Sequence, residues 1–230
     1  PGTVDFRYAP VDWHSPVSFA GEQGVSYISR AGGLLRNSSG GGVESIALHV
    51  DGAGGITALT QRCEEPHNPI LRTSVSYGAA TVEMSAFSSV HDDEGPVDNI
   101  TVAVTPAGQP LTLRLVIRAG GTLRTEIREE DDLPRGKVCF VERDGGPDHP
   151  LLILDAEPSV AREGDALVLT LRVAPGGDSG PDVYQLRVPR GEGDTDDIVS
   201  GTRKLPARAE KEIERWNAWK SLRGPAGWEL

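Results

Sequence analysis

The sequence predicts an all-β protein, a sandwich of two antiparallel sheets followed by helices at its C-terminal end. Three observations support this fold class. Apolar and polar residues alternate with a period of two in short runs along most of the chain, as in half-buried strands. Glycine and proline, 28 and 17 of the 230 residues, cluster between those runs, where turns need them. No fixed-length repeat is present, which disfavours a propeller or a β-helix.

Strands in the first half of the chain are marked by this alternation. They are expected at residues 43–50, 56–60, 71–76, 80–88, 99–104, 111–118 and 122–128. Residues 77–79 read Tyr-Gly-Ala and separate two of these runs as in a β-hairpin, with glycine available for a positive φ. In 111–118 leucine or isoleucine occupies every second position, and Val116 falls on the other face. One face of that strand should therefore lie on a core and the other in water.

The second half continues the pattern and brings the total to about a dozen strands. They are expected at residues 138–141, 151–154, 166–173 and 183–188. The acidic run 129–132 between the two halves is interpreted as a solvated loop. Residues 177–181, Gly-Asp-Ser-Gly-Pro, approach the nucleophile segment of chymotrypsin-like proteases, but no segment of the type that carries their histidine precedes them. We interpret this string as a turn.

The pattern changes after Arg190, and two helices are expected there. Asp194 or Thr195 is a suitable N-cap for the first helix. The second is expected at residues 207–222, with Pro206 in its first turn, where a missing N–H costs nothing.

The second predicted helix is amphipathic. The residues on its apolar side are Leu205, Ala209, Ile213, Trp216, Trp219 and Lys220. Such a stripe usually faces a core, so we expect Trp216 and Trp219 to pack on the sheet or to dock against a neighbouring domain. These features divide the chain into a sandwich domain, 1–190, and a helical linker, 191–230, that packs on it and leads to a further domain. Because the sequence opens on Pro1 and not on methionine, we expect a mature, trimmed or excised product, and the closing helix favours the front part of a longer protein.

Charge and hydropathy exclude two classes of partner. Acidic residues outnumber basic ones by 34 to 23, which gives a formal net charge of −11. Nucleic acid would be repelled, because no basic patch offsets this charge. No apolar run approaches the ~18 residues of a membrane-spanning helix, and no signal peptide opens the chain. We therefore expect neither a nucleic-acid nor a membrane partner.

No metal site or cofactor is expected. Cys63 and Cys139 lie far apart without a C-x-x-C pair, so they are either two buried free thiols or a single disulfide. The five histidines show neither H-x-H nor H-x-x-x-H spacing. His91 and the three acidic residues after it lack the pattern of a calcium loop and favour a solvated hairpin end. None of the 34 acidic residues is marked as a catalytic pair.

Three segments resemble parts of one family. They are residues 6–17 (FRYAPVDWHSPV), residues 24–35 (GVSYISRAGGLL) and residues 212–219 (EIERWNAW). They resemble, in turn, the opening, an early strand pair and the linker helix of the N-terminal domain of bacterial six-hairpin glycosidases. The resemblance covers roughly residues 3–222. It implies a β-supersandwich, similar in shape to galactose mutarotases, that leans on an (α/α)6 barrel carrying the catalytic acid and base. It also implies a secreted or periplasmic glycoside hydrolase, with no catalytic residue in this chain.

Three functional hypotheses follow from these observations. The first is a non-catalytic accessory domain of a carbohydrate-active enzyme, with the downstream catalytic domain as its partner in cis. The second is a stand-alone carbohydrate-binding module, in which Trp13, near an N-terminal loop, is the aromatic side chain most open to a sugar. The third is a mutarotase-like or lyase-like enzyme, which needs a histidine and a carboxylate in one cleft.

Overall fold

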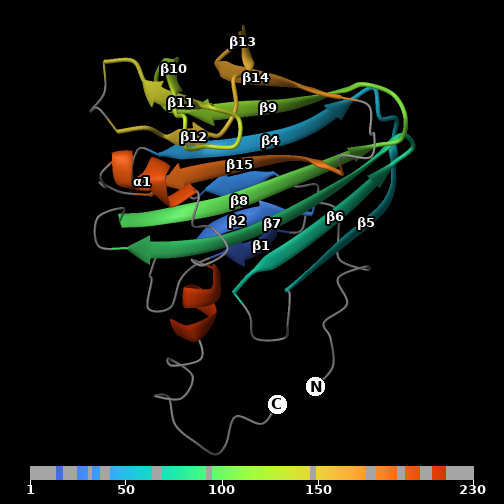
Figure 1. The fold of residues 1–230 in the computed structure, drawn as a ribbon, viewed down its shortest axis with the longest axis horizontal. Coiled ribbons are helices and arrows are strands. Elements are labelled where there is room, and N and C mark those ends of the chain that lie inside the picture. Colours follow the sequence, from blue (N-terminus) through green and yellow to red (C-terminus); the bar gives the residue numbers. More distant parts are fainter. Residues whose placement is uncertain are drawn as a thin grey trace, which may run out of the picture.

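Two antiparallel sheets face each other across a hydrophobic core (Figure 1). The computed structural model describes the following residues: 14–17, 25–30, 33–36, 42–63, 69–91, 95–145, 149–174, 180–190, 195–202 and 209–215.

The first sheet has seven strands. In spatial order they are β1 (His14–Val17), β2 (Ser26–Ser29), β3 (Leu34–Arg36), β4 (Val43–Asp51), β9 (Leu111–Ala119), β14 (Ala166–Val173) and β13 (Ser159–Glu163). The second sheet has eight strands. In spatial order they are β10 (Leu123–Glu129), β11 (Lys137–Arg143), β12 (Leu152–Leu154), β15 (Asp182–Pro189), β8 (Gly95–Pro106), β7 (Ala80–His91), β6 (Leu71–Tyr77) and β5 (Ile56–Cys63).

The predicted all-β sandwich of two antiparallel sheets is confirmed, since every pair of neighbouring strands is antiparallel. The described residues form fifteen strands instead of about a dozen. β13 was missed because all five of its residues are exposed, so no alternation marks it. The Tyr-Gly-Ala hairpin is confirmed as the connection between β6 and β7.

Two of the predicted turns carry the chain from one sheet to the other. β4 and β5 follow each other in sequence but lie in different sheets, as do β8 and β9. In the turn after β4, Gly52 and Gly54 have φ values of 86° and 79°, which glycine adopts without steric cost. Ala53 between them is buried, and its carbonyl accepts a hydrogen bond from the Ala79 amide at 2.9 Å. This turn therefore closes one end of the core against the β6–β7 hairpin.

The central strand β9 shows how the two faces of the first sheet differ. Leu113, Leu115 and Ile117 are buried in the main core, as the alternation predicts. Val116 on the opposite face is also buried, at 6% exposure, so the expectation that this whole face meets water was wrong. The cause is the position of β9 between β4 and β14, where Val168 on one neighbour and Ala47 on the other cover Val116.

Two helical segments pack on the outer face of the eight-stranded sheet. Ile198 and Val199 of α1 (Thr195–Gly201) pack against Phe140 and Ile153, which are cross-strand partners. The residues before and after each of these two point into the main core, so Phe140 and Ile153 themselves lie on the outer face. Residues 209–215 are also helical. No helix within the described ranges combines the length and apolar character that crossing a membrane requires.

The second helical segment places two residues of the predicted stripe on the sheet. Ala209 and Ile213 pack against Ile70 and Phe87. The rest of the expected helix, Trp216 and Trp219 included, lies outside the described residues.

Both cysteines are free, so they form no disulfide. Cys139 on β11 is buried, and burial raises the pKa of its thiol to about 12. Cys63 on β5 is exposed, which corrects the expectation of two buried thiols. The two cysteines lie on strands with β12, β15, β8, β7 and β6 between them, which keeps them too far apart to pair.

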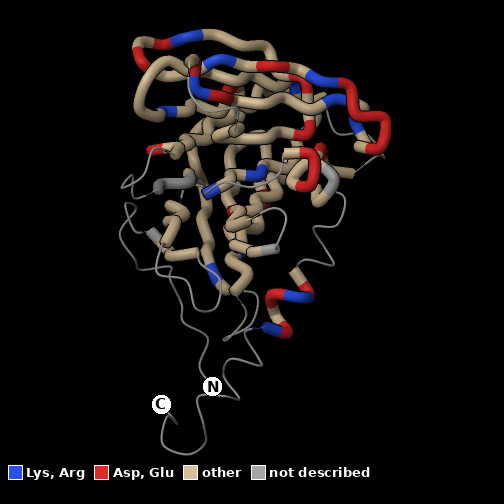
Figure 2. The backbone as a smooth tube through the Cα atoms, turned by 90° about the vertical axis from the view of Figure 1, so that its left-hand side faces the viewer, with Lys and Arg blue, Asp and Glu red and all other residues tan. Residues whose placement is uncertain are grey.

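Charged residues are frequent along the backbone at the upper end of the molecule, around β9, β13 and β14 (Figure 1 and Figure 2). Arg114 bridges Asp51 at 3.3 Å and Glu163 at 3.4 Å, and so links three strands of the first sheet. These partners are partly exposed, and pairs of this kind contribute only ~0–1 kcal/mol each. The acidic run 129–132 covers the last residue of β10 and the first part of the connection to β11. It is largely exposed, as expected of a solvated loop.

Candidate functional site

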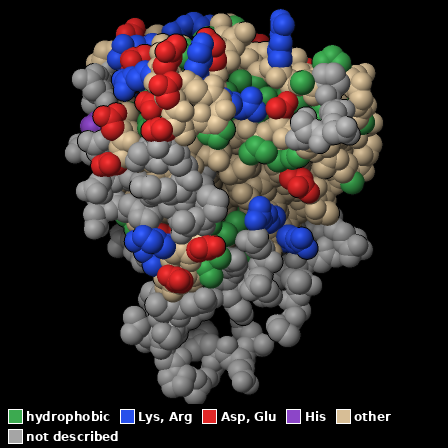
Figure 3. All heavy atoms as spheres, viewed as in Figure 1, with side chains coloured by type: hydrophobic (Ala, Val, Ile, Leu, Met, Phe, Trp, Pro, Cys, Tyr) green, Lys and Arg blue, Asp and Glu red, His purple; other side chains and the backbone are tan. Residues whose placement is uncertain are grey.

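The outer face of the eight-stranded sheet carries an open groove of about 610 Å³ on strands β5 to β8. The lining residues are Thr60, Arg62, Arg72, Thr73, Ser74, Glu83, Met84, Ser85, Thr101 and Ala103. We call this the β5–β8 groove. In Figure 1 these strands lie in front of β1 and β2. Figure 3 shows the same side, where backbone and uncharged polar atoms are interspersed with hydrophobic and charged side chains.

Strand alternation explains why the groove is polar. On β6, Leu71, Thr73 and Val75 are buried on the inner side, whereas Arg72 and Ser74 point outward. The same alternation holds on the neighbouring strands. It brings outward-facing residues into two cross-strand rows, Arg62–Arg72–Ser85–Thr101 and Thr60–Ser74–Glu83–Ala103. The groove therefore presents hydroxyl groups, two guanidinium groups and one carboxylate.

A buried polar chain holds β5 in place beneath the groove. Gln61 Oε1 accepts a hydrogen bond from Ser15 Oγ of β1 at 2.7 Å. Its amide nitrogen donates to Thr73 Oγ1 at 3.0 Å and to the Ser29 carbonyl of β2 at 3.2 Å. Because Gln61 is 3% exposed and uses both ends of its amide, it ties the edge of the eight-stranded sheet to the seven-stranded sheet.

A buried arginine fixes α1 at one side of the groove. Arg187 on β15 is fully buried and donates from Nε to Asn99 Oδ1 at 3.0 Å. Its Nη1 donates to the carbonyl of Ile198 in α1. Asn99 Nδ2 in turn donates to Ser89 Oγ at 2.8 Å. Asn99 and Thr101 are successive outward positions on β8, and Thr101 lines the groove. The part of the outer face that α1 and its contacts cover therefore begins directly beside the groove.

The helical residues 209–215 bound the groove at another point. Phe87, which they cover, is the next outward position on β7 after Ser85. Glu212 is fully buried, and Arg215 Nη1 donates to its Oε1 and to the Val90 carbonyl, each at 2.6 Å. Burial raises the pKa of Glu212, and the nearby Arg215 charge opposes that rise.

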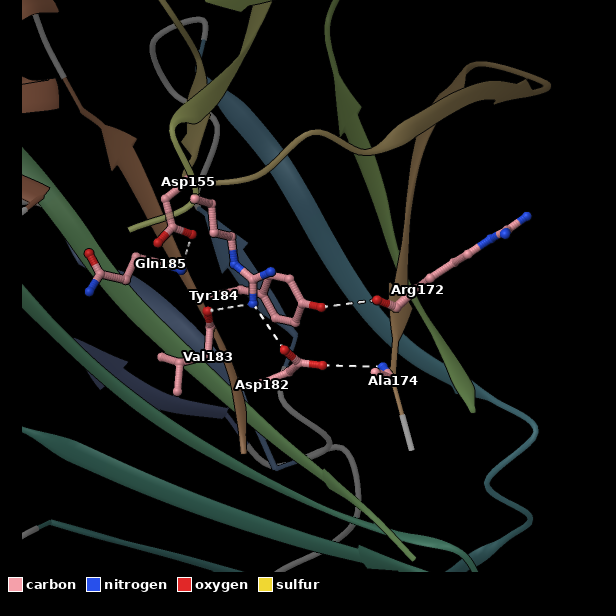
Figure 4. Close-up of polar contacts among 8 residues, drawn as sticks. Asp155, Arg172, Ala174, Asp182, Val183, Tyr184 and Gln185 are labelled. Atoms are coloured by element: carbon pink, nitrogen blue, oxygen red, sulfur yellow. Dashed lines mark hydrogen bonds and ion pairs between the residues drawn. The ribbon is translucent and has the colours of Figure 1, made fainter. Parts of the chain in front are cut away.

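A second group of titratable residues lies at the start of β15 (Figure 4). Asp155 Oδ1 accepts a hydrogen bond from the backbone amide of Gln185 at 2.6 Å, and burial raises the pKa of this carboxyl to about 7. Arg135 lies 4.3 Å from the centre of the Tyr184 ring and donates to Asp182 Oδ1 at 3.3 Å.

These contacts give the Asp155 group a structural role. Tyr184 Oη donates to the Arg172 carbonyl at 3.4 Å, and Asp182 Oδ2 accepts from the Ala174 amide at 3.3 Å, so the group ties β15 to β14 (Figure 4). A raised pKa often marks a catalytic acid. Asp155, however, is only 4% exposed, and its Oδ1 is occupied by the backbone amide of Gln185. Its carboxyl group is therefore not accessible to a substrate.

Another buried carboxylate links the two sheets. Asp98 on β8 accepts from Ser26 Oγ of β2 at 2.5 Å and from Ser88 Oγ of β7 at 2.6 Å. The guanidinium of Arg190 lies 3.1 Å from its Oδ1. Asp98 is 1% exposed, and these contacts satisfy its buried oxygens inside the sandwich.

The sequence singled out several candidate residues, and the structure describes only some of them. Trp13, Trp216 and Trp219 lie outside the described residues, and so do residues 177–179 of the protease-like string. Within the described ranges no three His, Cys, Asp or Glu residues are placed to hold a metal ion. Of the histidines whose side chains are described, neither His49 nor His149 lines the groove.

Sequence reasoning missed the groove because its residues are ordinary solvent-face residues on each strand taken singly. A signal was present in the run of Thr, Arg, Ser and Glu at alternate positions in four successive strands. It becomes visible only when strand order and register place those positions side by side.

The architecture, two antiparallel sheets with helical segments on one outer face, defines an antiparallel β-sandwich. Among solved structures, a bacterial glucoamylase complexed with acarbose shares the fold with a TM-score of 0.56 and 6% sequence identity. The likeness covers 95% of this chain and 40% of that chain. Because the sequence identity is so low, the likeness shows a common fold and nothing about activity.

Sequence comparison gives a second similarity of another kind. The E3 ubiquitin-protein ligase KEG of Arabidopsis thaliana is 27% identical over 173 residues, which is 74% of this chain and 10% of that protein. The chain thus spans a small part of this relative and less than half of the glucoamylase. No protein-family model matches the chain.

Proposed function

We propose that this chain is a non-catalytic accessory domain of a carbohydrate-active enzyme, which supports a catalytic barrel in cis and helps to shape its substrate cleft. The observation that carries the proposal is the fold likeness to the glucoamylase. It extends over nearly the whole of this chain, while the larger part of the glucoamylase chain has no counterpart in it. A domain of this kind lends surface and support while the chemistry takes place elsewhere.

The composition of the groove supports a non-catalytic role. Glycoside hydrolysis commonly needs two carboxyl groups about 5–10 Å apart across the scissile bond. Glu83 is the one acidic residue among those that line the β5–β8 groove. The buried carboxylates Asp98, Asp155 and Glu212 are each engaged by neighbouring groups of the described fold. The described residues therefore offer a binding surface and no catalytic pair in the groove.

Two measurements test this proposal. The 230-residue chain, incubated with a panel of α- and β-linked oligosaccharides, should release no reducing sugar. The protein isolated from its own cells should have an intact mass several tens of kilodaltons above that of these 230 residues. Robust turnover of any glycoside by the isolated chain, or a native mass equal to that of the chain, would overturn the accessory-domain role.

A stand-alone carbohydrate-binding module is the second candidate, and the open groove itself is the observation that favours it. Its volume falls within the ~300–1,000 Å³ typical of small-molecule sites. This candidate requires a native mass equal to that of the chain together with measurable sugar affinity. If Trp13 supplies the binding platform, Trp13→Ala should lower that affinity.

The third hypothesis, a mutarotase-like or lyase-like enzyme, requires a histidine beside a carboxylate in one cleft. His49 lies on β4 of the seven-stranded sheet, and His149 precedes β12. Neither reaches the groove that contains Glu83. This arrangement offers that hypothesis no support within the described residues.

A further inference from the structure

We infer that the β5–β8 groove binds an anionic saccharide, one that carries carboxylate or sulfate groups, through Arg62 and Arg72. This inference rests on the proposed function for the saccharide part of the ligand. The negative charge of the ligand is inferred from the charged residues that line the groove.

Arg62 and Arg72 are direct cross-strand partners on β5 and β6, and both line the groove. Residues in this relation have Cβ atoms about 4.5–5.5 Å apart, and like charges placed so are unfavourable to each other. An anion bound between the two guanidinium groups would be attracted by both. Each guanidinium also carries five N–H donors in a planar fork that matches a carboxylate or a sulfate, so a hydrogen bond within the protein leaves other donors for a ligand.

Several other arginines of the described fold pair with acidic residues. Arg118 pairs with Asp165, Arg124 with Glu142 and Arg128 with Glu126. Arg62 forms no ion pair with any residue that the structure describes, although the chain carries a net charge of −11. The acidic lining residue, Glu83, faces Ser74 in the register, one row away from the two arginines. Among its described lining residues the groove thus sets two arginines against one acidic residue, on a protein that is acidic overall.

The remaining lining groups suit a sugar. Thr60 and Ser74 are cross-strand partners, as are Ser85 and Thr101, so two pairs of hydroxyl groups lie beside the arginines. Hydroxyl groups donate and accept hydrogen bonds, as the hydroxyls of a saccharide do. Glu83 can accept from a sugar hydroxyl but would repel an acidic substituent. The expected orientation therefore places the acidic group of the ligand on Arg62 and Arg72 and its hydroxyl groups towards Ser74 and Glu83.

Isothermal titration of the 230-residue chain with three oligosaccharides of similar length tests the inference. The probes are oligogalacturonate, with carboxylates; heparin oligosaccharide, with sulfates and carboxylates; and maltoheptaose, which is neutral. Binding to at least one acidic probe and none to maltoheptaose at millimolar concentration is expected. The first two probes show which acidic group is preferred. Equal binding of maltoheptaose, or no binding of either acidic probe, would overturn the inference.

Variants of the groove sharpen the test. Arg62→Gln and Arg72→Gln should each weaken binding of the acidic probe about tenfold, the scale of one lost charge-assisted hydrogen bond at 1.4 kcal/mol per decade. Glu83→Gln should strengthen it, because the variant removes the like charge. Arg118→Gln on the seven-stranded sheet makes the same charge change away from the groove and should leave affinity unaltered. All four positions are outward-facing, so far-ultraviolet circular dichroism should be unchanged.

The outcomes separate this inference from the proposed function. Binding that is lost equally in Arg118→Gln and in the groove variants would show non-specific attraction of a polyanion and would overturn the site. A weakening by Glu83→Gln would contradict the anionic class of ligand. The accessory role depends instead on the native mass and on the absence of turnover, so either proposal can fail while the other stands.

Discussion

Asp155 illustrates how one buried carboxyl makes stability depend on pH. Desolvation raises its pKa from 3.8 to about 7, although the Gln185 amide and the Arg135 charge oppose the rise. The unfolded chain therefore loses this proton near pH 4, while the folded protein keeps it until about pH 7. Since the folded state binds more protons in that range, the stability that Asp155 contributes is complete below pH 4 and is lost as the pH rises to 7.

Asp155→Asn should remove this dependence. The variant stays neutral and retains an oxygen that can accept from the Gln185 amide, which lies 2.6 Å from Oδ1. We expect the free energy of unfolding of the variant to exceed that of the wild type on the order of 2 kcal/mol at pH 8, and the difference to vanish towards pH 4. Urea unfolding at pH 4, 6 and 8 measures it. A variant less stable than the wild type at pH 8 would contradict the assignment.

The residue scale is also where sequence analysis reached least far. Trp13, Trp216 and Trp219 were chosen because aromatic side chains are individually conspicuous, and they lie outside the described residues. Arg62 and Arg72 are ten positions apart, and nothing in their local sequence marks them. Their proximity is created by the β5–β6 register, which follows from tertiary pairing and from no local pattern.

At the scale of elements, α1 depends on the sheet beneath it. A helix of seven residues is too short to be stable alone in water, so its contacts must hold it. Ile198 and Val199 supply the apolar contact, and Arg187 supplies hydrogen bonds to Ile198 and Asn99. The helix should therefore detach when Arg187 is removed, before the sheet itself unfolds.

Arg187→Ala tests this dependence. The variant leaves Asn99 Oδ1 without the Arg187 donor and removes one of the donors to the Ile198 carbonyl, which also accepts from Thr202 Oγ1 at 3.4 Å. We expect a loss of about 3 kcal/mol in the free energy of unfolding. Hydrogen exchange should become fast at residues 195–202 while the core strand β9 stays protected. Arg172→Ala, an exposed position on β14, should change stability by less than about 0.5 kcal/mol. Unchanged protection of α1 in Arg187→Ala would refute the anchoring role.

Elements with a buried face were predictable, and those without one were not. β9 was predicted because its leucine and isoleucine side chains enter the core at every second position. β13 was missed because its pairing with β14 depends on backbone hydrogen bonds alone, with all side chains exposed. The start of α1 at Thr195 matches the expected cap region, because capping is a local property of the chain.

At the scale of the whole molecule, the two sheets are joined by polar as well as apolar contacts. Asp98 accepts a hydrogen bond from Ser88 and pairs with Arg190 on the side of the eight-stranded sheet. It also accepts a hydrogen bond from Ser26 of the seven-stranded sheet. Which strands meet in this way could not be read from the sequence, because the three partners are 10, 92 and 72 positions from Asp98. The sandwich class was predictable from alternation, whereas its internal polar links were not.

Asp98→Ala should destabilise the sandwich as one unit. The substitution leaves the guanidinium of Arg190, whose side chain is 5% exposed, without its carboxylate in the interior, and breaking a buried pair in this way typically costs about 3–5 kcal/mol. Asp98→Asn keeps an oxygen for the two serine hydroxyls but loses the charge, so its cost should be intermediate. Asp165→Ala breaks the exposed pair with Arg118 and should cost less than about 1 kcal/mol. Urea unfolding followed by circular dichroism measures all three, and hydrogen exchange in β9 and in β8 follows the two sheets separately. If Asp98 links the sheets, β9 and β8 should lose protection together at lower urea in Asp98→Ala; separate transitions would mean that each sheet is stable without this link.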